Sequence, residues 1–286
     1  MILPILLLAA FIVPVLAVSA VAWWSPLRVG ERLAASAWAK RLQRGHRALI
    51  AELGPLATGI GLLLAGSAAI VAVCWPLGKV AAMLERPVDV PVLEWMQAQA
   101  SPTSALTSVV TQLTKMGDLT SIAFLALAAA ALFAVLWRRR WWWIPPIVLA
   151  LPVVAEAVLQ RVLALLVDRG HPPTALGTYP SGGTARIIAL SGVLFFLALA
   201  TWPGIRPRWR AIGWTAVGLL GALEAFTRFY LLQHWPTDLV GGWIFGELLL
   251  LVILAAVWPV ARLRPALIDD DDDETGESAR APLTGH

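Results

Sequence analysis

The sequence predicts an all-α, polytopic membrane helix bundle of about seven transmembrane helices, and three observations support this prediction. Of the 286 residues, 59% are hydrophobic and only 14% are charged, and the mean hydropathy is +0.75. A soluble domain of this length needs more charge to cover its surface. Apolar runs of about 20 residues, the length that lets a helix cross about 30 Å of hydrocarbon, recur along the chain. Basic residues gather in alternate connecting segments.

Seven apolar runs have the length and composition of spans. We expect them at 2–24, 54–75, 119–137, 141–166, 184–203, 211–231 and 239–261. The first run has no basic leader, is longer than the apolar part of a signal peptide, and does not end in a clear cleavage site of small residues. We therefore expect it to be a retained span.

The connecting segments predict the orientation. Segments 25–52, 138–140, 206–210 and 262–264 carry most of the basic residues. With seven spans all four lie on the same side, and the positive-inside rule makes that side cytoplasmic. We therefore expect a multi-pass protein of the plasma membrane, with its N-terminus outside and its C-terminus in the cytoplasm.

Three regions follow from this layout. Residues 1–52 hold the first span and a basic, amphipathic segment suited to anionic head groups on the cytoplasmic side. Residues 53–264 form a membrane-embedded core of six helices, and residues 265–286 form an acidic, disordered cytoplasmic tail. Within the outer segment 76–118, we expect a short helix along the membrane surface near 90–96.

Composition also argues against other classes of protein. The net charge of +4 is small and scattered over loops, so no nucleic-acid partner is expected. Cys74 is the only cysteine, so no disulfide framework can form. The histidines, which are His46, His171, His234 and His286, lack the spacing of metal ligands, so neither a metal nor another cofactor is expected.

The clearest chemical pattern runs from the end of the sixth predicted span into the loop after it. It contains Thr227, Arg228, His234 and Asp238, and the last two are four residues apart, one turn of a helix. A carboxylate at that distance can accept the imidazole N–H and raise the basicity of the ring, which makes the other nitrogen a good nucleophile toward phosphorus. An arginine beside it can hold phosphoryl oxygens.

This pattern resembles the third motif of the type 2 phosphatidic acid phosphatase family, S-R-x5-H-x3-D, with Thr227 in place of the Ser. The resemblance implies that His234 is the nucleophile that forms a phosphohistidine. It also implies that Asp238 orients this histidine and that Arg228 binds the phosphate. The alternative is a structural role, in which an interfacial His and Arg cap helix ends.

The family's second motif, P-S-G-H, is matched in part by Pro180, Ser181 and Gly182. Ser181, Gly182 and Gly183 stand before an apolar span, where free N–H groups at a helix N-terminus can bind an anion. Gly183 stands where the family has a histidine that protonates the leaving alcohol. The sequence therefore lacks the family's general acid at this position.

The first motif, K-x6-R-P, is weaker. His171 stands in the place of the family's arginine, Ala164 in the place of its lysine, and Arg169 lies two residues early. Arg161 lies about one turn before Ala164, and Arg186 lies one turn into the span after Gly183. The alternative for Arg161 and Arg186 is that they extend to the membrane interface.

These positions give one hypothesis for the site. Arg161, Arg169, Arg186 and Arg228 supply positive charge for a phosphate, and His171 replaces the missing general acid. A diphosphate tolerates the loss of an acid better than a lipid monophosphate, because its leaving phosphate needs less protonation.

The predicted function is therefore an extracytoplasmic lipid phosphate or polyprenyl diphosphate phosphatase or phosphotransferase, whose partners are substrate and membrane lipids. The alternative is an inactive relative that binds or moves phospholipid or polyprenyl phosphate. A transporter would need polar residues in the middle of several spans, and the main exceptions to aliphatic spans here are Glu156 and Glu247. Glu156 has no assigned role, beyond a possible arginine or helix-dipole partner.

Overall fold

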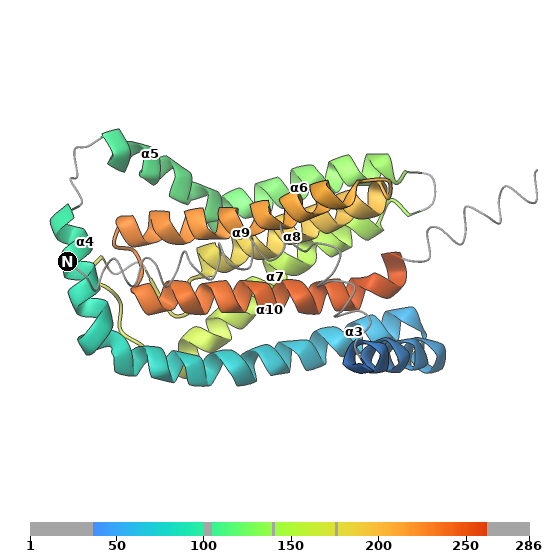
Figure 1. Cartoon of the computed structure of the whole chain (residues 1–286), viewed down its shortest axis with the longest axis horizontal. Helices are drawn as coiled ribbons and strands as arrows, with labels where there is room; N and C mark the ends of the chain where they lie inside the picture. The colour runs from blue at the N-terminus through green and yellow to red at the C-terminus, as the bar shows by residue number, and fades with distance from the viewer. Residues whose placement is uncertain (1–36, 100–104, 139–140, 175–176, 262–286) are drawn as a thin grey trace, which may run out of the picture.

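The structure, a computed structural model, describes residues 37–99, 105–138, 141–174 and 177–261, and within this part every regular element is helical. Six long helices form a bundle (Figure 1). They are α3 (Ala37–Leu84), α6 (Leu119–Leu136), α7 (Ile144–Val167), α8 (Gly182–Thr201), α9 (Pro207–Tyr230) and α10 (Pro236–Ala261). The predicted span 2–24, the start of the basic segment and the tail lie outside the described residues.

Five helical stretches in the described part are long and apolar enough to cross a membrane. They lie in α3 with its continuation, α6, α7, α8 and α10, and they correspond to five of the predicted spans. The all-α, multi-pass character of the protein is therefore confirmed. The predicted span 211–231 is corrected: α9 is a helix of suitable length, but it is not among the five candidate spans, and it carries charged residues at both ends.

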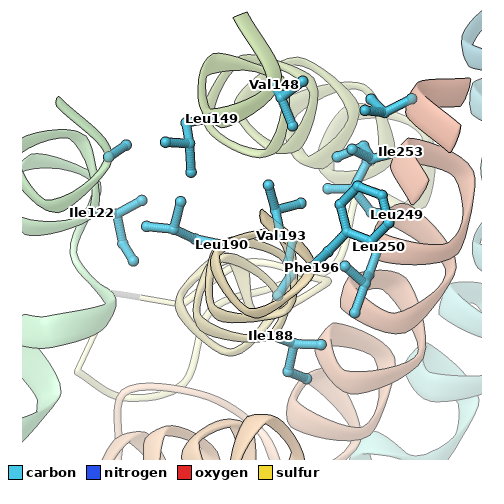
Figure 2. Close-up of a cluster of buried hydrophobic side chains, with 14 of the residues drawn as sticks. Ile122, Val148, Leu149, Ile188, Leu190, Val193, Phe196, Leu249, Leu250 and Ile253 are labelled. Atoms are coloured by element: carbon cyan, nitrogen blue, oxygen red, sulfur yellow. The ribbon is translucent and has the colours of Figure 1, made fainter. Parts of the chain in front are cut away.

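Helix α8 lies at the centre of the bundle. Figure 2 shows its residues Ile188, Leu190 and Val193 among side chains from α6, α7 and α10. Helices α8 and α10 approach closely because α10 has small residues in the contact. A Cβ on Gly246 would lie 2.8 Å from the Cα of Ala185. Small residues at such crossings let membrane helices pack backbone to backbone.

Helix α3 is bent at Gly54, whose φ of 79° is a conformation that favours glycine. Before the bend lie the exposed Arg41, Arg44 and Arg47, and after it lies the apolar part of the helix. The described part of the predicted basic segment is thus a helix that meets the first described span at an angle, as Figure 1 shows.

Short elements cover one end of the bundle. After α3 come a π-helical turn η1 (Glu85–Asp89) and the helix α4 (Val90–Gln99). They are followed by α5 (Ala105–Leu113) and a 3-10 turn η2 (Thr114–Gly117). Figure 1 shows α4 leaving the end of α3 and α5 leading back to α6. The helix expected near 90–96 is present as α4.

The two ends of the bundle differ in their polar residues. Helix α3 begins, α6 ends and α9 begins at the end away from α4, so the described basic segments gather there (Figure 1). The loops that carry the predicted motifs, between α7 and α8 and between α9 and α10, lie at the end near α4.

Candidate functional site

Two loops bring the second and third motif segments together. The backbone N–H of Ser181 donates a hydrogen bond of 3.0 Å to the carbonyl oxygen of Asp238. The Ser181 side chain is fully buried and shares a hydrogen bond of 3.2 Å with the hydroxyl of Thr184. Ser181 is the N-cap of α8, and Asp238 lies in the first turn of α10. The close packing of α8 against α10 therefore sets the relative position of the two motifs.

His234 lies in the turn between α9 and α10 and is only 5% exposed. Its Nδ1 lies 3.7 Å from Oδ2 of Asp238, within ion-pair range but too far for a hydrogen bond. Among the described residues this nitrogen has no hydrogen-bond partner. Burial lowers the pKa of His234 and the neighbouring Arg228 and Arg186 lower it further, while Asp238 opposes them. The ring is therefore neutral at pH 7.

The hydrogen bond predicted between His234 and Asp238 is not formed in this structure, because other donors use the carboxylate. Oδ1 of Asp238 accepts a hydrogen bond of 2.8 Å from Nη1 of Arg169, and Oδ2 accepts one of 3.3 Å from the backbone N–H of Trp235. The spacing placed the two side chains side by side, but it did not reveal this competition.

Arg169 is the centre of a buried ion-pair network. Besides Asp238, its guanidinium contacts Asp89 through Nη2 and Glu85 through Nε, the latter at 3.4 Å. Thr237 accepts a further hydrogen bond of 2.7 Å from Nη1 and donates to Asp89. Arg169 thus joins the turn η1 after α3, the loop after α7 and the start of α10. Glu85 and Asp89 were not predicted as site residues, although two acids four residues apart between apolar segments are a signal in the sequence.

Arg228 is also held by acidic side chains. Its Nε donates to Oε1 of Glu224 at 2.6 Å, and its Nη2 donates to Oδ1 of Asp118 at 3.1 Å. The carbonyl oxygen of Thr114 and the amide oxygen of Gln233 accept longer hydrogen bonds, of 3.4 and 3.5 Å. Glu224 was not predicted as a site residue, although it stands one helical turn before Arg228.

Arg186 forms a second pair of the same kind. Its Nε donates to Oε2 of Glu156 at 2.6 Å, and its Nη1 donates to the carbonyl oxygen of Gly117 at 3.1 Å. Glu156 is fully buried within α7, and its Oε1 has no hydrogen-bond partner among the described residues. Glu156, to which the sequence assigned no role, is therefore the ion-pair partner of Arg186.

The two glycines after Ser181 have no room for side chains. A Cβ on Gly183 would lie 2.1 Å from Nε and 2.5 Å from Nη2 of Arg228. A Cβ on Gly182 would lie 2.6 Å from Nη2 of Arg186 and 2.7 Å from Oε1 of Glu156. At position 183, where the family resemblance leads one to expect a histidine, the Arg228 guanidinium occupies the space of the side chain.

His171 and His234 both lie beside Gly177. Nδ1 of His171 lies 2.5 Å from the carbonyl oxygen of Gly177, while a Cβ on this glycine would lie 2.7 Å from Nδ1 of His234. His171 is exposed. The replacement acid and the nucleophile predicted from the sequence therefore lie beside the same glycine.

Arg161 does not join the other arginines. It is exposed on α7 and makes no hydrogen bond or ion pair to the described residues. Its neighbour Gln160 instead supports the second loop, donating 2.8 Å to the hydroxyl of Thr178. Of the four arginines predicted to form the site, Arg169, Arg186 and Arg228 are each paired with a buried carboxylate, and Arg161 is not.

Comparisons with known proteins gave one match to a protein family and one to a solved structure. Residues 166–262 match the model of the PAP2 superfamily. Among solved structures, the chain is similar to the crystal structure of the first transmembrane PAP2 type phosphatidylglycerolphosphate phosphatase from Bacillus subtilis, with 20% sequence identity and a TM-score of 0.46. That match covers 68% of this chain and 93% of the other. Among curated proteins, none matches.

Proposed function

We propose that this chain, a membrane phosphatase-like protein of the PAP2 superfamily, removes phosphate from a lipid phosphate or lipid diphosphate through a phosphohistidine on His234. The observation that supports this proposal most directly is the burial of a neutral His234 beside Asp238, in a turn joined to the Ser181 segment. A neutral imidazole has the free electron pair that an attack on phosphorus requires.

The proposed reaction has two steps. Nδ1 of His234 faces Asp238, which leaves Nε2 to attack phosphorus as the bond from phosphorus to the leaving oxygen breaks. The leaving oxygen then takes a proton, for which His171 is the candidate donor identified from the sequence. Water next attacks the phosphohistidine, which releases inorganic phosphate and restores the imidazole. A diphosphate suits this site because its leaving phosphate depends less on the proton.

The proposed binding groups are the free N–H groups at the start of α8 and the guanidinium groups of Arg228 and Arg186. Helix α8 begins with Gly182 and Gly183, so backbone N–H groups are not covered by side chains of these two residues. We assign Arg169 a positioning role instead, because Glu85, Asp89 and Asp238 already accept its hydrogen bonds.

We place the reaction on the extracytoplasmic face. The described basic segments lie at the end of the bundle opposite to the turn between α9 and α10, which holds His234, and basic segments are retained on the cytoplasmic side. The lipid substrate would then present its phosphate at the outer surface of the plasma membrane.

Replacement of the nucleophile tests the proposal. His234→Ala is expected to reduce phosphate release from lipid phosphates and diphosphates in detergent to background, because no other group forms the covalent intermediate. His46→Ala, in the basic part of α3 at the other end of the bundle, is the matched control and is expected to keep full activity. Equal release from the wild-type and His234→Ala proteins would rule out this mechanism, and so would the absence of an acid-labile phosphoryl group on the wild-type protein.

The pH dependence of the reaction provides a second test. Burial lowers the pKa of His234 below its ordinary value of 6.5, so the neutral, nucleophilic form persists as the pH falls through 6.5. We expect the acidic limb of kcat/KM to lie below pH 6.5, after correction for the substrate's own titration. A limb centred at or above pH 6.5 would contradict the placement of His234 in a buried site.

A second candidate function is lipid phosphate binding without hydrolysis. It is favoured by one observation: Arg228 fills the space beside Gly183, so no side chain at that position can protonate a leaving group. Binding of a lipid phosphate by the wild-type protein, with no release of inorganic phosphate and no phosphohistidine, would indicate this function.

A further inference from the structure

Three glycines surround the paired acids and arginines of the site. A Cβ on Gly117 would lie 2.0 Å from Oε1 of Glu224, just as Cβ atoms on Gly182 and Gly183 would meet Arg186 and Arg228. These glycines come from the turn η2 and from the start of α8. At each glycine, a side chain from one of the ion pairs occupies the space that a Cβ would need. The ion pairs therefore depend on glycine at these three positions.

Arg228 has few donors left for a ligand. A guanidinium has five N–H groups, and hydrogen bonds to Glu224, Asp118, Thr114 and Gln233 use four of them. A phosphate that binds an arginine in the usual two-pronged way needs two parallel N–H groups. At least one of the present acceptors must therefore leave before Arg228 can bind a phosphate in this way.

Glu224 and Asp118 differ in how firmly they hold Arg228. Glu224 lies 2.6 Å from Nε, and its side chain is 4% exposed. Asp118 lies 3.1 Å from Nη2 and is 54% exposed. Water can replace the Asp118 carboxylate at little cost, whereas the Glu224 carboxylate is enclosed against Gly117. Glu224 therefore stays beside Arg228 when Asp118 leaves, and its negative charge repels an incoming anion.

We infer that Glu224 is an internal anion of this site: its carboxylate holds Arg228 beside Gly183, and its negative charge opposes the binding of a phosphate to Arg228. This inference rests on the proposed function, because it takes Arg228 as a phosphate-binding residue. Glu224 acts here as a positioning residue that lowers the affinity of the site for phosphate. A ligand that also contacts the N–H groups at the start of α8 compensates for this repulsion.

The test measures the affinity of the full-length protein for inorganic phosphate in detergent, from the rise in thermal stability with phosphate concentration. Glu224→Gln keeps the shape of the side chain but removes its charge, so the dissociation constant for phosphate is expected to fall about tenfold. A residue with a purely structural role would give the opposite result, a weaker site. Glu247→Gln, an exposed residue of α10 that accepts a hydrogen bond from Trp243, is the matched control and should leave the constant unchanged.

A second variant keeps the inference testable if Glu224→Gln does not fold. Gly117→Ala retains the charge of Glu224 but pushes its carboxylate away from Arg228, so it is expected to strengthen phosphate binding as well. Unchanged or weaker binding in the folded variants would overturn the inference. Because this measurement needs no turnover, it remains decisive even if His234→Ala shows that the proposed hydrolysis is wrong.

Discussion

Arg169→Met is expected to destabilise the protein by about 3–5 kcal/mol, since it removes the cation from a buried group of carboxylates. The Arg169 side chain is 1% exposed, as is that of Asp238, and Asp89 is fully buried. Methionine fills much of the volume but leaves these acids without a charged partner. The thermal unfolding midpoint in detergent, followed by circular dichroism, measures the loss.

The matched control is Arg161→Met. Arg161 lies only eight residues earlier, is exposed, and has no partner among the described residues, so its replacement is expected to change stability by less than about 0.5 kcal/mol. Asp89→Asn in the Arg169→Met background should restore part of the loss, because it removes one of the unpaired charges. Equal midpoints for the two methionine variants would show that Arg169 does not hold this end of the bundle together.

Gly183→His, which completes the family's second motif, is expected to destabilise the protein by about 1–3 kcal/mol instead of creating a better active site. The first carbon of the new side chain would already lie within 2.1 Å of the Arg228 guanidinium. The arginine must then move, and Glu224 would lose its hydrogen-bond partner in a buried position. Thermal unfolding and phosphate release, measured together, test both parts of this expectation.

Gly183→Ala isolates the steric part of the effect. Its control is Gly218→Ala in α9, where a Cβ meets no atom within 4 Å, so that variant should be neutral or slightly more stable. Gly183→Ala combined with Arg228→Ala should lose less stability than the sum of the two single variants, because the clash disappears with the guanidinium. A Gly183→Ala protein as stable as Gly218→Ala would contradict the observed position of Arg228.

The sequence predicted the helices of the described part because their signals are local. Runs of apolar residues gave α6, α7, α8 and α10 within a few residues of their observed bounds. The same signal overestimated the span at α9: the length of its helix was predicted correctly, but the charged residues at its two ends make it less apolar than a span.

The sequence also predicted that the loops between α7 and α8 and between α9 and α10 lie close together, but it did not predict which side chains pair. The spacing of His234 and Asp238 correctly indicated neighbours. The actual partner of Asp238 is Arg169, which lies 69 residues away in the chain. Most of the acids that hold the three arginines lie outside the motifs, among them Glu85, Asp89 and Glu156.

By itself, the sequence determined that this chain is a helical membrane protein with a histidine, an arginine and an aspartate at phosphatase-like spacing, because hydrophobic runs and helical periodicity act over a few turns. Only the tertiary structure decided that the arginines are paired with buried acids and that Arg228 takes the place beside Gly183. Ion pairs of this kind depend on distances between helices far apart in sequence, since a buried charge pairs with whichever opposite charge the packing brings within reach.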